Sequence, residues 1–110
     1  MTSELATKHC KPCEGEVDAL ESDRIKELQK ELNSDWDVIE DHHIEKEFKF
    51  DDYKQAVDFT NKVANLAMEE DHHPDLLLSY GKVKVTLTTH NVGGLSENDF
   101  VMAAKIEENK

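Results

Sequence analysis

Apolar residues recur along this chain with two different spacings, and each spacing predicts a type of element. Between residues 53 and 67 they occupy i, i+3, i+4 and i+7 positions through about four turns, which is typical of a helix with one buried face. Asp51 and Asp52 stand where an N-cap is needed. Pro74 must follow the end of the helix, because proline cannot donate a backbone hydrogen bond and disfavours a helical residue before it. The pattern predicts a long helix that ends near 71–73.

Two shorter helices are predicted on either side. The segment from Ser22 to Leu32 repeats its apolar residues at helical spacing and stops at Asn33 and Ser34. Near the other end, Ser96-Glu97-Asn98-Asp99 has the form of a capping box, with Asp in place of the usual Glu, ahead of an apolar segment. We therefore expect a helix before the first strands and another after the last.

Strands are predicted where apolar and polar residues alternate. Such segments lie at 36–39, 44–50, 76–80 and 82–88, and Gly81 forms a turn between the last two. The order becomes αββαββα, in which two hairpins are separated by the long helix. This favours an α+β fold, with a four-stranded antiparallel sheet and helices packed on one face, over a parallel doubly wound fold. We expect a flexible polar leader at 1–21 and one domain at 22–110.

Composition and charge limit the possible functions. The 110 residues fit one compact domain, and 25 acidic against 13 basic residues give a formal net charge of −12. A nucleic-acid backbone would meet net repulsion, so direct nucleic-acid binding is not expected. No stretch approaches the roughly 18 apolar residues that cross a bilayer, and Met1 to Lys11 lacks the apolar core of a signal peptide. We therefore expect a soluble, cytoplasmic protein with no membrane partner.

Histidine and cysteine are the candidate chemical groups. Six histidines are present, and histidine exchanges protons near neutral pH. His72 and His73 stand at the predicted helix exit and His90 follows a predicted strand, whereas His42 and His43 are expected in an exposed turn. From the residues alone, an acid–base site, metal ligation and solvated surface histidines all remain open. Cys10 and Cys13 form a single CxxC with no second pair, in what we interpret as a plain leader.

A spaced set of residues narrows these alternatives. Five residues separate His72-His73-Pro74 from Tyr80, nine more lead to His90, and eight more lead to Asp99. Together with Phe48-Lys49-Phe50, Leu87-Thr88-Thr89-His90 and Gly94-Leu95-Ser96-Glu97-Asn98-Asp99, this set resembles the pterin-4a-carbinolamine dehydratase family from about Trp36 to Ile106. Two positions depart from the family pattern: Met68 replaces a charged residue, and Leu76 replaces an aromatic one.

The resemblance implies a hydro-lyase that removes water from a 4a-hydroxytetrahydropterin and gives the quinoid dihydropterin, in tetrahydropterin recycling for aromatic amino-acid hydroxylation. It implies that His72 and His90 form the acid–base pair and that His73 holds the pterin and shares in proton transfer. Residues expected to bind substrate are His73, Pro74, Tyr80 and Asp99. No cofactor and no metal are expected, because one acid and one base suffice for dehydration.

Several roles stay open within this interpretation. Asp99 either caps the last helix or orients a histidine, and Tyr80 either packs at a strand end or stacks on the pterin. Trp36 is expected to pack in the core. The resemblance also implies a homodimer or homotetramer. The alternative function is a non-catalytic protein-binding module, since animal members of the family are dimerisation partners of a homeodomain transcription factor.

Overall fold

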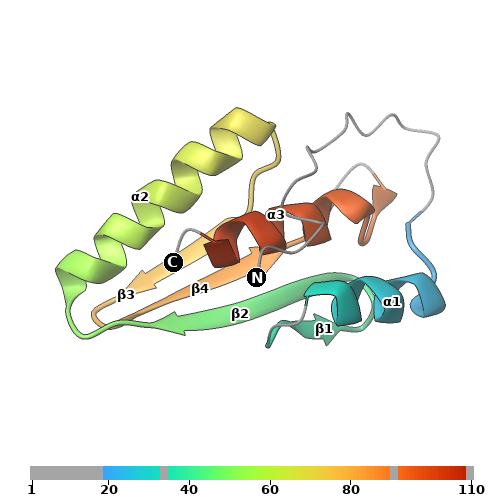
Figure 1. The fold of residues 1–110 in the computed structure, drawn as a ribbon, viewed down its shortest axis with the longest axis horizontal. Coiled ribbons are helices and arrows are strands. Elements are labelled where there is room, and N and C mark those ends of the chain that lie inside the picture. The colour runs from blue at the N-terminus through green and yellow to red at the C-terminus, as the bar shows by residue number, and fades with distance from the viewer. Residues whose placement is uncertain (1–18, 33–34, 90–91, 109–110) are drawn as a thin grey trace.

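The computed structural model describes residues 19–32, 35–89 and 92–108, in which three helices and four strands alternate (Figure 1). The elements are α1 (Ser22–Leu32), β1 (Asp37–Ile39), β2 (His43–Lys49), α2 (Tyr53–Glu70), β3 (Asp75–Ser79), β4 (Lys82–Leu87) and α3 (Glu97–Glu108). The αββαββα order predicted from the sequence is confirmed.

The four strands form one antiparallel sheet in the order β1-β2-β4-β3. β1 pairs with β2 and β3 pairs with β4 as the two expected hairpins. The hairpins join through β2 and β4, with Ile44 opposite Leu87 and Phe48 opposite Val83. β1 and β3 are therefore the edges of the sheet, and β4, which leads toward the predicted site, is held between two neighbours.

One face of the sheet is apolar and the other is charged. Ile44, Phe48 and Val85 point inward and are at most 5% exposed. On the opposite face, Lys84 pairs with Glu45 at 3.3 Å across β2 and β4. Because side chains alternate between the two faces of a strand, this division places the helices on the apolar face only. The predicted α+β fold with helices on one face is confirmed (Figure 1).

α3 lies at the centre of the helical layer, in contact with both α1 and α2 (Figure 1). Most of its residues are buried, and the sequence Phe100 to Ala104 is buried without interruption. At its end, Glu107 accepts a hydrogen bond of 3.1 Å from the indole of Trp36, which is 2% exposed and packs in the core as expected. The last helix is therefore central to the hydrophobic core, and most of its first turn is buried.

The described part of the chain begins just before α1. The backbone N–H of Leu20 donates to the carbonyl of Leu95 at 2.8 Å, so this segment packs beside the loop that leads into α3. Most of the predicted leader, residues 1–18 with Cys10 and Cys13, lies outside the described residues. None of the described helices is long and apolar enough to cross a membrane.

Candidate active site

The histidine doublet leaves the end of α2 through a sharp change in backbone direction. Asp71 adopts the left-handed conformation with φ 51°, and its N–H donates to the carbonyl of Ala67. The N–H of His72 donates to the same carbonyl at 3.2 Å. Pro74 then prevents further helix, and β3 begins at the next residue. His72 and His73 are thus fixed between a helix end and a strand start.

A second backbone turn brings the start of α3 close to His72 at the end of α2. After β4, Thr89 forms an isolated bridge with Gly94, and its N–H donates to the Gly94 carbonyl at 2.8 Å. Gly93 takes a φ of 69°, a conformation that glycine adopts without steric cost. Ser96 then precedes the first residue of α3, so Asp99 lies in the first turn of that helix.

These two turns bring His72 and Asp99 into direct contact although they are 27 residues apart in the sequence. Nε2 of His72 lies 2.6 Å from Oδ1 of Asp99. The side chain of Asp99 is completely buried, and that of His72 is 10% exposed. A short hydrogen bond in so little water is strong and directional. The sequence predicted both residues as site residues, and the structure places them side by side.

The other oxygen of Asp99 is held by the protein. Oδ2 accepts a hydrogen bond of 2.8 Å from the Thr89 hydroxyl and one of 2.9 Å from the backbone N–H of Ser96. The Ser96 bond is one half of the predicted capping box. Asp99 therefore fulfils both roles that the sequence left open, because one oxygen caps α3 and the other contacts a histidine.

This arrangement determines which nitrogen of His72 carries the proton in the neutral ring. A carboxylate accepts hydrogen bonds, so Nε2 donates to Asp99 and Nδ1 is left as the acceptor of the neutral ring. Within residues 19–32, 35–89 and 92–108, every buried side-chain nitrogen and oxygen has a hydrogen-bond partner. The site thus contains an imidazole held by a buried carboxylate, a type of group that often serves as a general acid or base.

The remaining predicted site residues are not all gathered here. His73 is exposed and Pro74 half-buried, and both adjoin His72 in the sequence. His90 lies outside the described residues and follows Thr89 directly in the chain. Tyr80 is 71% exposed in the turn after β3, so it does not pack as core. β3 spans roughly 16 Å at about 3.3 Å per residue, which places Tyr80 at the opposite end of that strand from His72.

The chain is similar to known proteins along almost its whole length. Residues 18–109 match the family model described as pterin 4 alpha carbinolamine dehydratase. The chain belongs to this family. Provisionally named pterin-4-alpha-carbinolamine dehydratases from Alkaliphilus metalliredigens and Rubrobacter xylanophilus are 53% and 42% identical to it. These alignments cover 94% of both chains in the first case, and 96% of this chain and 97% of the relative in the second.

A solved structure extends the likeness to three dimensions. The crystal structure of transcriptional coactivator/pterin dehydratase from Brucella melitensis has a TM-score of 0.76 and 33% sequence identity, over 83% of this chain and 97% of that one. The predicted membership of the pterin-4a-carbinolamine dehydratase family is confirmed, and with it the prediction of an enzyme of the hydro-lyase class. The roles of individual residues stay predictions.

The two positions that depart from the family pattern differ in their surroundings. Met68, which replaces a charged residue, is 66% exposed in the last turn of α2. Leu76 is half-buried on β3, opposite Val85, and packs against the core. With Met68, the end of α2 lacks the charged side chain of the family pattern. With Leu76, the inner face of β3 stays apolar but lacks the aromatic side chain of that pattern.

The second histidine doublet lies at a different turn. His42 is exposed and His43 begins β2, and their Nδ1 atoms are 3.1 Å apart. The exposed turn that we expected is present for His42, but the expectation is wrong for His43, which is half-buried as the first residue of β2. In the part of the chain that the structure describes, no three His, Cys, Asp or Glu side chains gather as a metal site. The expected absence of a metal stays a prediction, because His90 and the two cysteines are not among these residues.

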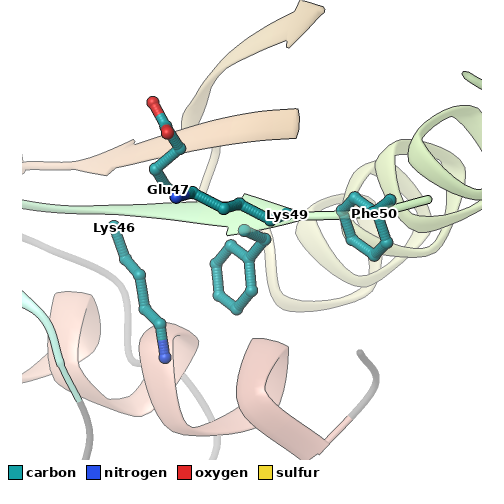
Figure 2. A pocket seen from close by; sticks show the side chains of 5 residues that line it. Lys46, Glu47, Lys49 and Phe50 are labelled. Carbon is teal, nitrogen blue, oxygen red and sulfur yellow. The ribbon is translucent and has the colours of Figure 1, made fainter. Parts of the chain in front are cut away.

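Two shallow clefts lie at the other end of the sheet. One follows β2 from Lys46 to Phe50, and Figure 2 shows Lys46 and Glu47 leaving opposite faces of the strand. The other is lined by residues that include Phe50, Tyr80 and Lys82. Neither contains His72 or Asp99. Neither cleft has a histidine in its lining, so neither adds an acid–base group of the predicted kind.

Thr89 and Ser96 are the members of the site that sequence reasoning did not single out. Both are buried polar residues, with exposed fractions of 5% and 7%. Each lies in a quoted family segment, but a hydroxyl residue in a loop is usually a capping or turn residue. Only the bond from Thr89 to Asp99 shows that these hydroxyls belong to the site.

Proposed function

We propose that this chain dehydrates 4a-hydroxytetrahydropterin to quinoid dihydropterin by histidine acid–base catalysis. The observation that carries the proposal is the His72–Asp99 pair, in which a nearly buried imidazole is held at 2.6 Å by a buried carboxylate. Membership of the dehydratase family supports the choice of substrate. We place the reaction in tetrahydropterin recycling for aromatic amino-acid hydroxylation, as the sequence resemblance implies.

The reaction needs one proton donor and one proton acceptor. Hydroxide leaves carbon 4a as water once an acid protonates it, and a ring nitrogen of the pterin loses a proton to a base. No electrons are exchanged, so neither a redox cofactor nor a metal is required by the balance of the reaction. General acid–base catalysis typically contributes roughly 10² to 10⁴-fold, which suits a dehydration with a good neutral leaving group.

We assign the proton transfers to His72 and His90, with His73 binding the pterin and sharing in them. His90 is the next residue in the sequence after Thr89, whose hydroxyl lies 2.8 Å from the carboxylate that holds His72. His73 and Pro74 follow the end of α2, and Asp99 lies in the first turn of α3. Tyr80 stays our candidate for stacking on the pterin, although it lies at the far end of β3 from His72.

The proposal is tested by the rate of 4a-hydroxytetrahydropterin dehydration with purified protein. The experiment compares the wild type, His72→Ala, His90→Ala and an EDTA-treated sample, with His42→Ala as the matched control on the exposed doublet. We expect both site variants to lose activity, while EDTA and His42→Ala leave it unchanged. A folded wild type without activity contradicts the proposal, and loss of activity in EDTA contradicts the metal-free mechanism.

We also propose that the chain assembles as a homodimer or homotetramer in the cytoplasm. β3 is an edge strand of the described sheet, and its central residue Leu77 is 63% exposed. An apolar side chain on an open edge is a surface that proteins normally cover. A net charge of −12 supports the expectation that the chain does not bind a nucleic acid directly.

A second function, a protein-binding module without catalysis, is favoured by one observation. The related protein from Brucella melitensis is described as a transcriptional coactivator as well as a pterin dehydratase. A binding role does not need an imidazole that transfers protons, so it survives His72→Ala and His90→Ala. Retained partner binding in these variants, with no dehydratase activity in the wild type, would favour this function over the enzyme.

A further inference from the structure

Two buried hydroxyls stand behind the carboxylate that holds His72. The Thr89 hydroxyl lies 2.8 Å from Oδ2 of Asp99 and 2.7 Å from the hydroxyl of Ser96. All three side chains are buried, and Asp99 has no exposed surface. Water therefore does not compete for these hydrogen bonds, and the protein alone decides their direction.

The direction of the chain of hydrogen bonds follows from the number of protons available. The Thr89 hydroxyl has one proton, and a bond to a carboxylate is stronger than a bond to a neutral hydroxyl. Thr89 therefore donates to Asp99, and Ser96 donates to Thr89. The backbone N–H of Ser96 donates a second bond to the same oxygen of Asp99. Oδ2 is thereby occupied from two sides.

With Oδ2 occupied, only Oδ1 of Asp99 is left for the histidine. It lies 2.6 Å from Nε2 of His72, which must carry a proton to donate. In the neutral ring, Nδ1 then has a free lone pair. A carboxylate that moved away from the ring would leave the Nε2–H of His72 without this acceptor, so the tautomer of His72 depends on Asp99 being held in place.

We infer that Thr89 is a positioning residue which, through Asp99, fixes the Nε2–H tautomer of His72 and makes Nδ1 the atom that exchanges protons with the substrate. This inference rests on the proposed dehydratase function for the identity of the substrate, but the tautomer itself does not depend on activity. Thr89 touches no reacting atom. Its contribution is to keep one carboxylate oxygen engaged so that the other faces the imidazole.

The experiment uses the full-length protein labelled with ¹⁵N. Long-range ¹H–¹⁵N spectra at pH of about 8, above the ordinary titration range of histidine, report which ring nitrogen carries the proton, and His72→Gln assigns the signal. The variants are Thr89→Val, which replaces the hydroxyl with a methyl of similar size, and Thr89→Ser, which restores it. Thr88→Val is the matched control, because the Thr88 hydroxyl donates to the carbonyls of His42 and Gly94 and not to Asp99.

We expect the Nε2–H tautomer in the wild type, Thr89→Ser and Thr88→Val, and a mixture of tautomers in Thr89→Val. In kinetics, kcat falls about tenfold in Thr89→Val, the effect of losing one hydrogen bond to a charged group, while KM changes less than about twofold. Thr89→Ser returns kcat to within about twofold of the wild type. Recovery by serine separates the hydroxyl from the packing of the side chain.

If Thr89→Val does not fold, Thr89→Ala takes its place, since it also removes the hydroxyl that donates to Asp99 and keeps the backbone bond from Ser96. It then decides the matter by the same two measurements, with the same expected loss of kcat. An Nδ1–H tautomer in the wild type overturns the inference, and so does an unchanged tautomer and kcat in the folded hydroxyl variant. A fixed Nε2–H tautomer without dehydratase activity instead overturns the proposed function and leaves the positioning intact.

Discussion

Replacing Asp99 by asparagine changes one buried oxygen into an N–H donor and leaves the shape of the side chain almost unchanged. The amide oxygen has two lone pairs, which suffice for the Thr89 hydroxyl and the Ser96 N–H. The NH₂ group then faces His72 in place of Oδ1. Nε2 of His72 must therefore lose its proton and accept a hydrogen bond. Asp99→Asn therefore preserves the cap of α3 and moves the proton of the neutral His72 ring from Nε2 to Nδ1.

The magnitude follows from the bond that is lost. A hydrogen bond to a charged group contributes about 1.5 to 3 kcal/mol, and 1.36 kcal/mol corresponds to a tenfold change in rate. We expect kcat/KM for dehydration to fall about ten- to hundredfold in Asp99→Asn. The free energy of unfolding should fall by only about 1 kcal/mol, because a neutral hydrogen bond replaces the charged one. Asp99→Ala would instead leave three buried donors unpaired and is the poorer test.

The assay pairs the rate of 4a-hydroxytetrahydropterin dehydration with urea unfolding of the same samples. Asp58→Asn is the control, since it removes a carboxylate from the exposed face of α2, where Asp58 pairs with Lys54 at 3.2 Å. Its kcat/KM should equal that of the wild type. A folded Asp99→Asn that keeps kcat/KM within about twofold would refute the reasoning that the carboxylate supports catalysis through His72.

Three further predictions concern the fold and its assembly. Phe48→Ala should lower the free energy of unfolding by about 3 to 5 kcal/mol, because Phe48 is 5% exposed in the core. Urea unfolding followed by circular dichroism measures this change, and a loss below about 1 kcal/mol contradicts the packing. Asp52→Ala should cost about 0.5 to 2 kcal/mol by removing the acceptor of the Gln55 N–H at 2.8 Å, with Asp52→Asn recovering most of it in the same assay. Leu77→Glu places a charge on the edge strand opposite Lys84 and should reduce the oligomer mass in light scattering, whereas an unchanged mass places the interface elsewhere.

The long helix was predictable because its signals are local. The spacing of apolar residues between 53 and 67 defines its buried face, and the Asp52 side chain accepts the N–H of Gln55 as an N-cap should. The two hairpins were predictable for the same reason, since each joins strands that are neighbours in the sequence. The pairing of β2 with β4 was not predicted. Alternation tells which face of a strand is buried but not which distant strand lies beside it.

In the site, too, the position of each residue in its own element was predictable, whereas the contacts between distant residues were not. The position of His72 at a helix exit follows from Pro74, and the position of Asp99 in a first turn follows from the capping pattern. Their contact depends on how α2 and α3 pack, which no short segment encodes. Thr89 could not be recognised at all, since its hydroxyl acquires a role only when a carboxylate ten residues later folds back onto it.

The place of Asp99 in the last helix has a consequence for the order in which the enzyme becomes active. Domains form as units during synthesis, beginning with the segments made first. All four strands and the histidine doublet precede residue 99 in the chain. A growing or truncated chain that lacks α3 therefore has His72 without its carboxylate and the apolar face of the sheet without its central cover. Under the proposed mechanism, dehydratase activity therefore requires α3, because the helix that covers the centre of the sheet also carries Asp99.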